Sequence, residues 1–174
     1  VWIAGGGVDN IDYEITSSGK IEVSSVDSNT NSTAEFTVML ILMSLRNINS
    51  KEGQGVWSSF DHGGSDLFFK NVGILGLGRI GRIVARALKS LGANVVAYDN
   101  DKENSAFEKF DIPCKSFEEV MKFSDILSIH LPRNYQTRDL IGKKELMMMP
   151  SDSILVNTAR GDIVVEKDLI EVLN

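Results

Sequence analysis

The feature that most constrains the fold is a ten-residue run in which an apolar stretch meets three closely spaced glycines. The run reads VGILGLGRIG, residues 72–81, and the three spaced glycines at its end are Gly76, Gly78 and Gly81. The apolar residues before Gly76 predict a buried strand, and residues 79–91 predict a helix. A G-x-G-x-x-G sequence at such a junction gives a tight turn, a close approach of backbone to ligand, and close helix–strand packing. The run therefore predicts a strand–turn–helix unit of an α/β domain.

Predicted strands and helices alternate from residue 71 to residue 174. The further predicted strands are 94–99, 125–132 and 153–157, and further helices are expected to begin near Ser116, Thr137 and Glu166. Ser116 and Glu119 have the spacing of a capping box, as do Ser32 and Glu35 at the start of a helix predicted over 32–47. That earlier helix is apolar on nearly every side, which predicts burial between layers or against a partner. The alternation predicts a parallel sheet covered on both faces.

The first 70 residues are less regular. Residues 1–4 resemble the end of a strand that runs into the turn GGGVDN, and a short helix or turn is expected over 12–18, ending at Gly19. The segment KIEVSSV at 20–26 alternates like a strand, and residues 50–70 are expected to form a loop.

Composition excludes several classes of partner and compartment. The chain has 174 residues, 43% hydrophobic and 24% charged, which is ordinary for one soluble globular domain. Its net charge of -6 argues against nucleic acid as a partner. The longest apolar stretch, Val38 to Met43, is too short to span a membrane, and no secretory signal is evident. The single cysteine, Cys114, is interpreted as structural and fits a reducing compartment, so the cytoplasm is expected.

A carboxylate at the end of the second predicted strand extends the glycine motif. Asp99 follows Gly81 by eighteen residues, where it is placed to accept hydrogen bonds from both hydroxyls of an adenosine ribose. Asn100 and Asp101 come next, and no arginine stands beside them to receive a 2'-phosphate. The sequence therefore predicts a dinucleotide site that takes NAD in preference to NADP. No metal site is predicted.

Two more polar residues end predicted strands on the edge where ligands bind in open α/β sheets. His130 could act as a general acid or line the cofactor crevice, and the second interpretation is favoured because no carboxylate neighbour is evident. Arg160 offers a fork of donors suited to a carboxylate and an adjacent carbonyl. Its alternative role is a surface salt bridge, for example with Asp162, but the small residues around it favour a ligand. His62 is interpreted as a surface residue.

Several segments together resemble the D-isomer-specific 2-hydroxyacid dehydrogenases. They are GVDNID, NSTAEFTVMLILMSLR, VGILGLGRIGR, VVAYD, SDILSIHLPRNYQTRDLIGKKEL and ILVNTARGDIVVEKDLIEVL, and they cover nearly the whole chain in order. The resemblance is nearest to the D-3-phosphoglycerate dehydrogenase branch, through GVDNID and SNTNSTAE. It implies an α/β fold with a Rossmann-type, doubly wound parallel sheet, incomplete and preceded by the end of a flavodoxin-like substrate domain. Residues 1–28 would be that end, and 29–174 the NAD-binding domain with a crossover helix at about 32–47.

The resemblance also assigns roles to individual residues. It implies NAD binding by Gly76, Leu77, Gly78, Arg79, Ile80, Gly81, Asp99, His130, Leu131, Pro132, Thr137, Thr158, Ala159 and Arg160. Arg160 would bind the substrate carboxylate and carbonyl as the catalytic arginine, helped by backbone N–H groups at Gly6 and Gly7. Gly6 departs from the bulkier residue common in the family, which bears on substrate fit. The helix at about 32–47 would also form a homodimer surface.

The resemblance implies an NAD-dependent oxidoreductase that moves a hydride between nicotinamide and C2 of a D-2-hydroxy acid or 2-keto acid. The substrate stays open between 3-phosphoglycerate of serine biosynthesis and the substrates of a glyoxylate or hydroxypyruvate reductase. The alternative from another class is a corepressor-like, dinucleotide-sensing binding protein of the same fold. The family's general acid, a histidine paired with a glutamate, has no match in this sequence. We therefore expect a fragment that binds NAD weakly and does not turn over.

Overall fold

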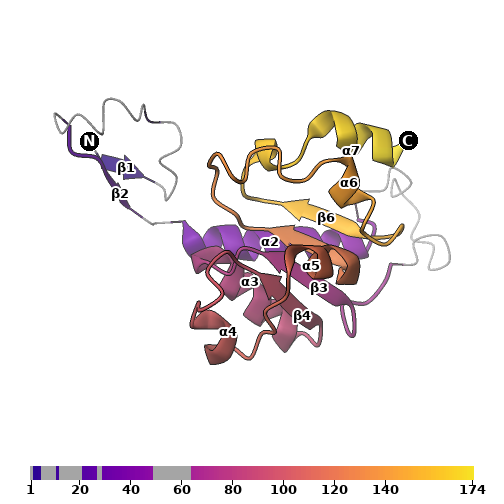
Figure 1. Ribbon diagram of the computed structural model, residues 1–174. Helices are drawn as coiled ribbons and strands as arrows, with labels where there is room; N and C mark the ends of the chain where they lie inside the picture. Colours follow the sequence, from indigo (N-terminus) through magenta and orange to yellow (C-terminus); the bar gives the residue numbers. More distant parts are fainter. Residues whose placement is uncertain (1, 5–10, 12–20, 27–28, 49–63) are drawn as a thin grey trace.

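A computed structural model of the chain describes residues 2–4, 11, 21–26, 29–48 and 64–174. Most of them build one parallel sheet flanked by helices (Figure 1). Its strands are β3 (Asn71–Leu75), β4 (Asn94–Tyr98), β5 (Ile126–Ile129) and β6 (Ile154–Asn157), in the spatial order β4-β3-β5-β6. Every neighbouring pair is parallel. The parallel α/β sheet predicted from the alternation of strands and helices is confirmed.

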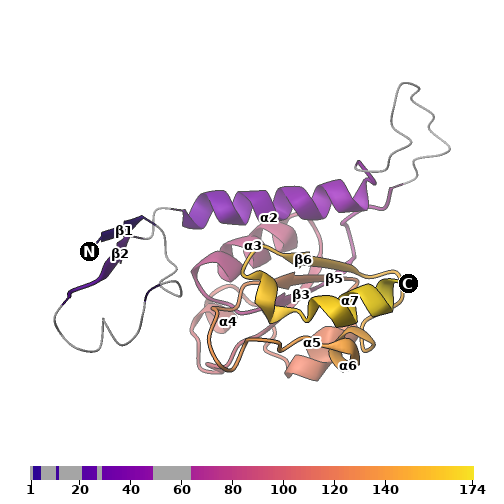
Figure 2. The ribbon, with the colours of Figure 1, turned by 90° about the horizontal axis from the view of Figure 1, so that it is seen from above.

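Two helical layers enclose the sheet. Figure 2 shows α2 (Thr30–Leu45) and α3 (Arg79–Ser90) on one side, and α5 (Phe117–Phe123), α6 (Lys143–Leu146) and α7 (Glu166–Leu173) on the other. A short helix, α4 (Ala106–Lys109), follows β4, and a 3-10 turn (Gly161–Ile163) follows β6. Alternate side chains of each strand face opposite layers. In β3, Ile74 is buried with α2 and α3, whereas Leu75 is buried with α5 and α6.

A second, small sheet pairs β1 (Trp2–Ala4) with β2 (Ser24–Val26) in parallel. Both strands fall inside segments for which the sequence predicted strands. The predicted turn at 5–10, the predicted helix at 12–18 with Gly19, and most of the predicted loop at 50–70 lie outside the described residues.

The helix predicted to begin near Thr137 is wrong. Residues 135–139 form a turn, and α6 begins only at Lys143. The side chain of Asn134 accepts the N–H groups of Gln136 and Thr137, at 2.8 and 3.1 Å, and Asp139 has a positive φ of 54°. Short polar side chains that bond nearby backbone compete with helix formation, so the polar turn takes the place of the helix.

One of the two predicted capping boxes forms. The Ser116 hydroxyl accepts the Glu119 N–H at 3.3 Å, and the Glu119 carboxylate accepts the Ser116 N–H at 2.8 Å. The box predicted at Ser32 is wrong, because α2 begins two residues earlier, with Asn29 as its cap residue. Ser32 therefore lies in the first helical turn, where its hydroxyl donates to the Asn29 carbonyl at 3.1 Å.

We expect Ser116→Ala to lower the free energy of unfolding by about 1 kcal/mol, because it removes an N-cap acceptor. Ser32→Ala is the matched control: it should change stability by less than about 0.5 kcal/mol, since an exposed first-turn serine caps nothing and alanine favours helix. Urea unfolding followed by circular dichroism measures both values. Equal losses in the two variants would contradict the assignment of the caps.

Candidate functional site

Parallel pairing brings the predicted site residues to one edge of the sheet. The register pairs put the last residues of the four strands in one row, in the order Tyr98, Leu75, Ile129 and Asn157. The residues that come next along each strand are Asp99, Gly76, His130 and Thr158. These positions lie up to 82 residues apart in the chain. The sheet thus gathers them at its carboxyl edge, where open α/β sheets bind ligands.

The three glycines of the turn at this edge differ in why a side chain is absent. Gly76 has a φ of +93°, a conformation that side chains rarely adopt. A β-carbon on Gly81 would lie 2.0 Å from the carbonyl oxygen of Gly76, so helix α3 could not pack so closely on the turn. A β-carbon on Gly78 would meet nothing within 4 Å. Internal packing therefore does not require Gly78, and the open space beside it fits the approach of a diphosphate to the start of α3.

Asp99 holds this turn in place from the next strand. One carboxylate oxygen accepts the Leu77 N–H at 2.7 Å, and the other accepts the Asp101 N–H at 3.0 Å. The Asn104 side-chain amide donates to the Leu77 carbonyl at 3.2 Å, a contact that the sequence analysis missed. The Leu77 side chain is buried in the core, so only its main chain reaches the site. Asp99 thus joins the glycine turn to the position predicted for the ribose.

The two residues that open α3 differ in environment. Arg79 is exposed, whereas Ile80 packs against the core on the α2 and α3 side of the sheet. The first N–H groups of a helix have no acceptor within the helix. Together with the open space at Gly78 and the Asp99 carboxylate, this arrangement fits a dinucleotide cofactor.

His130 stands beside the glycine turn. Its Nε2 lies 2.9 Å from the hydroxyl of Ser128, a buried residue on the same strand face that the sequence analysis did not single out. Burial lowers the pKa of His130 from 6.5 to about 4. The imidazole is therefore neutral at pH 7, and this favours a ring that lines the crevice over a general acid. After it, Leu131 packs into the core and Pro132 is exposed.

Thr137 lies in the turn that follows His130. Its side chain is buried, and its hydroxyl oxygen lies 2.5 Å from the Pro132 carbonyl oxygen and 2.9 Å from the Asn134 nitrogen. The hydroxyl donates to that carbonyl and accepts that N–H, so both contacts stabilise the turn. The structure therefore places Thr137 as a support beneath the exposed loop.

Arg160 sits at the far end of the edge, in a turn organised by Asn157. The Asn157 side chain donates to the Arg160 carbonyl at 2.8 Å and accepts the Ala159 N–H at 3.0 Å. Asn157 was not among the residues predicted for the site, although asparagine commonly bonds to backbone a few residues away. Asp162, considered above as a salt-bridge partner for Arg160, is paired at 2.6 Å with Arg133. Arg160 is an exposed residue at this edge, and its Nη1 donates to the Ala159 carbonyl at 2.9 Å.

Three predicted positions have no described counterpart. Gly6, Gly7 and His62 lie outside the described residues. Among the residues that are described, no group of three or more His, Cys, Asp or Glu side chains could hold a metal ion. Cys114 is exposed.

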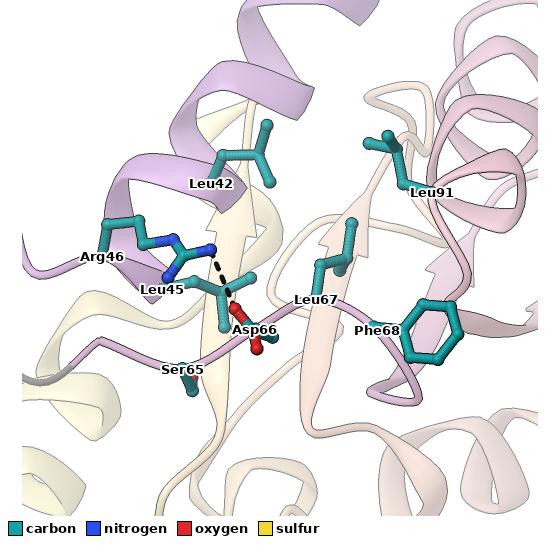
Figure 3. A pocket seen from close by; sticks show the side chains of 8 residues that line it. All are labelled: Leu42, Leu45, Arg46, Ser65, Asp66, Leu67, Phe68 and Leu91. Atoms are coloured by element: carbon teal, nitrogen blue, oxygen red, sulfur yellow. Dashed lines mark hydrogen bonds and ion pairs between the residues drawn. The ribbon is translucent and has the colours of Figure 1, made fainter.

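An apolar pocket of about 260 Å³ lies at the opposite edge of the sheet (Figure 3). It is lined by Leu42, Leu45, Arg46, Ser65, Asp66, Leu67, Phe68 and Leu91. Its only charged groups, Arg46 and Asp66, pair with each other at 2.8 Å. Phe68 and Leu91 each precede the start of a strand, so the pocket belongs to the amino edge. The candidate site is the carboxyl edge. No helix in the described part of the chain is long and apolar enough to cross a membrane.

Comparison with known proteins identifies the domain. The family model described as "D-isomer specific 2-hydroxyacid dehydrogenase, NAD binding domain" matches residues 37–174. The chain is 36% identical to a D-3-phosphoglycerate dehydrogenase of Methanocaldococcus jannaschii, and the match covers 98% of this chain. It is 37% identical to a glyoxylate reductase of Aeropyrum pernix, over 96% of this chain and 53% of the relative.

A solved structure agrees with the sequence relatives. The D-isomer specific 2-hydroxyacid dehydrogenase of Lactobacillus delbrueckii ssp. bulgaricus, solved in its NAD complexed form, matches with a TM-score of 0.81 and 31% identity. The match covers 99% of this chain and 54% of that one. The chain spans about a third of the length of the D-3-phosphoglycerate dehydrogenase from Methanocaldococcus jannaschii (33%). With the glycine turn, the carboxyl-edge row and these matches in agreement, the chain belongs to the D-isomer specific 2-hydroxyacid dehydrogenase family, whose NAD-binding domain it carries.

Proposed function

We propose that this chain is the cofactor-binding part of an NAD-dependent oxidoreductase that interconverts a D-2-hydroxy acid and its 2-keto acid. The observation that carries the proposal is the row at the carboxyl edge, which runs from the Asp99 carboxylate through the glycine turn and His130 to the turn that holds Arg160. An anionic group for a ribose stands at one end, and a cationic group for a substrate carboxylate at the other. Residues 1–28 are proposed as the end of a substrate domain, and 29–174 as the NAD-binding domain.

At the cofactor end, the start of α3 and the Gly78 backbone hold the diphosphate, and Asp99 accepts the ribose hydroxyls. Thr158, Ala159, Leu131 and Pro132 border the nicotinamide side, and the Thr137 hydroxyl holds the Pro132 carbonyl. When bound, NAD supplies the hydride-accepting and hydride-donating carbon of its nicotinamide ring.

At the substrate end, Arg160 binds the carboxylate and polarises the neighbouring carbonyl oxygen. A guanidinium keeps its charge throughout, because it is not deprotonated near neutral pH. Backbone N–H groups at Gly6 and Gly7 are proposed to share the carboxylate. The substrate hydroxyl also needs a proton donor and acceptor, and the low pKa of His130 makes it unsuited to that task at pH 7. Another group must therefore carry the proton.

We propose 3-phosphoglycerate as the first candidate substrate, because a D-3-phosphoglycerate dehydrogenase is similar over nearly the whole chain. Glyoxylate is the second candidate, supported by the similar glyoxylate reductase. We further propose a cytoplasmic homodimer that pairs through α2, whose outer face exposes Phe36, Met39 and Leu42. A second copy would cover these three apolar side chains. A dinucleotide sensor without turnover is the alternative function.

Replacing Asp99 by Asn should raise the Kd for NADH about tenfold and narrow the preference for NADH over NADPH, because a charged acceptor for the ribose is lost. The amide oxygen can still accept the Leu77 N–H, while the Asp101 N–H loses its acceptor. Asp101→Asn is the control, two residues away, and should leave both affinities unchanged. Titration of NADH and NADPH fluorescence measures them; equal affinity of Asp99→Asn and the unchanged protein would contradict the ribose assignment.

Arg160→Lys should lower kcat/KM for the preferred 2-keto acid about 100-fold, since a point charge cannot reproduce the two-pronged contact. Loss of NADH absorbance with 3-phosphohydroxypyruvate, glyoxylate, hydroxypyruvate and pyruvate identifies that substrate in the protein that contains this chain.

Arg138→Lys, at an exposed arginine paired with Asp139, is the control and should retain full activity. Unchanged kinetics in Arg160→Lys would remove Arg160 from the site. Tight NADH binding without turnover of any of the four acids would favour the sensor.

His130 should stay unprotonated in the folded chain as the pH falls to about 4. The unfolded chain takes up this proton near 6.5, so the free energy of unfolding should fall as the pH drops from about 6.5 to 4. His130→Gln, which keeps a polar partner for Ser128, should flatten that slope. The imidazole signals of the two histidines, assigned with His62→Gln, report the titration by NMR, and a His130 midpoint near 6.5 would contradict its burial.

A further inference from the structure

The turn that carries Arg160 is joined to a helix more than a hundred residues away in the chain. The hydroxyl oxygens of Thr37, on α2, and Thr158, just after β6, lie 2.8 Å apart. Thr37 is fully buried, although the other buried residues of α2, which are Ala34, Ile41 and Leu45, are all apolar. A buried hydroxyl is retained at little cost only where it is hydrogen-bonded. The contact with Thr158 therefore helps to satisfy a hydroxyl that is buried between α2 and the sheet.

The neighbours of Thr37 fix the direction of this bond. Its hydroxyl donates to the carbonyl of Thr33, one helical turn earlier, at 2.8 Å. A carbonyl oxygen only accepts, and a hydroxyl has one proton to give. Thr158 must therefore be the donor to Thr37. The chain of bonds runs from Thr158 through Thr37 to the Thr33 carbonyl, and it fixes the rotamers of both side chains.

The same turn is held on its other sides as well. Asn157 clamps the Ala159 N–H and the Arg160 carbonyl, and Asp162 is paired with Arg133. The Asn157 contacts are local to the turn and fix its shape. Among the hydrogen bonds described at residues 157–160, the bond to Thr37 is the one that joins the turn to α2.

We propose that Thr37 is a positioning residue that sets the place of Arg160 through Thr158. It touches neither substrate nor cofactor. Removing its hydroxyl leaves Thr158 without its acceptor and frees the turn to shift, and small misplacements of a substrate-binding group lower catalytic efficiency strongly. The anchoring of the turn rests only on these contacts, whereas its effect on turnover rests on the function proposed above.

The test compares Thr37→Val, which keeps the shape but lacks the hydroxyl, with Thr37→Ser, which keeps the hydroxyl. Hydrogen–deuterium exchange of a peptide covering residues 154–163 should quicken about fivefold in Thr37→Val, the effect of one lost hydrogen bond. Thr37→Ser should restore most of the protection. Ser44→Ala is a matched control, because Ser44 also donates to the carbonyl one turn earlier, at 2.8 Å, but is exposed. It should leave this peptide unchanged.

Kinetics in the protein that contains this chain form the second readout. Thr37→Val should raise KM for the 2-keto acid and lower kcat/KM roughly tenfold, with the Kd for NADH changed by less than about twofold. In an Arg160→Lys background, Thr37→Val should lower kcat/KM little further, because both substitutions weaken the same contact between Arg160 and the substrate. A merely structural role would lower stability without this non-additivity.

The outcomes separate the two proposals. Unchanged exchange at 154–163 in Thr37→Val, or equal quickening in Ser44→Ala, would overturn the positioning role. If Thr37→Val fails to fold, Thr158→Val removes the same bond from the turn, and unchanged exchange there would overturn the role equally. Quickened exchange without any turnover in the unchanged protein would support the anchor and reject the proposed enzyme.

Discussion

Parallel pairing of β3 with both β4 and β5 is the constraint on which the site depends. It aligns Leu75 with Tyr98 on one side and Ile129 on the other, and β5 then aligns β6. Parallel strands all end at the same edge, so residues separated by a helix in sequence become neighbours there. The carboxylate at Asp99 and the guanidinium at Arg160 owe their common edge to this pairing, which the two buried layers of side chains stabilise.

The glycine turn shows how fold and ligand make separate demands on three similar residues. Gly76 and Gly81 are required by the protein itself, through a positive φ and a contact that a β-carbon would prevent. Gly78 meets no such demand and faces open space. Asp99 combines the two kinds of role, since it bonds the Leu77 N–H while standing where a ribose is expected. A site built this way gains rigidity from the groups that bind the ligand.

Local sequence patterns predicted the start of a helix correctly only where no other start was available nearby. The box at Ser116 formed as its spacing predicted, whereas the same spacing at Ser32 did not, because α2 starts at Thr30 and leaves Ser32 inside the helix. The helix expected at Thr137 gave way to a turn organised by Asn134. At Thr137 a neighbouring polar side chain set the backbone, and spacing alone carries no information about that competition.

The sequence by itself determined the parallel α/β class, the glycine turn, the carboxylate after the second strand, and the family, because each depends on residues close together in the chain. The tertiary structure decided which polar side chains of the site contact one another and which turns they stabilise. Ser128 contacts His130 because both side chains lie on one face of the strand. Asn104 donates to the glycine turn from the loop that follows β4. Thr37 meets Thr158 across 121 residues, a contact that only the packing of α2 against the end of β6 creates. No local pattern encodes such a pairing, because it arises from the summed burial of two layers on one sheet.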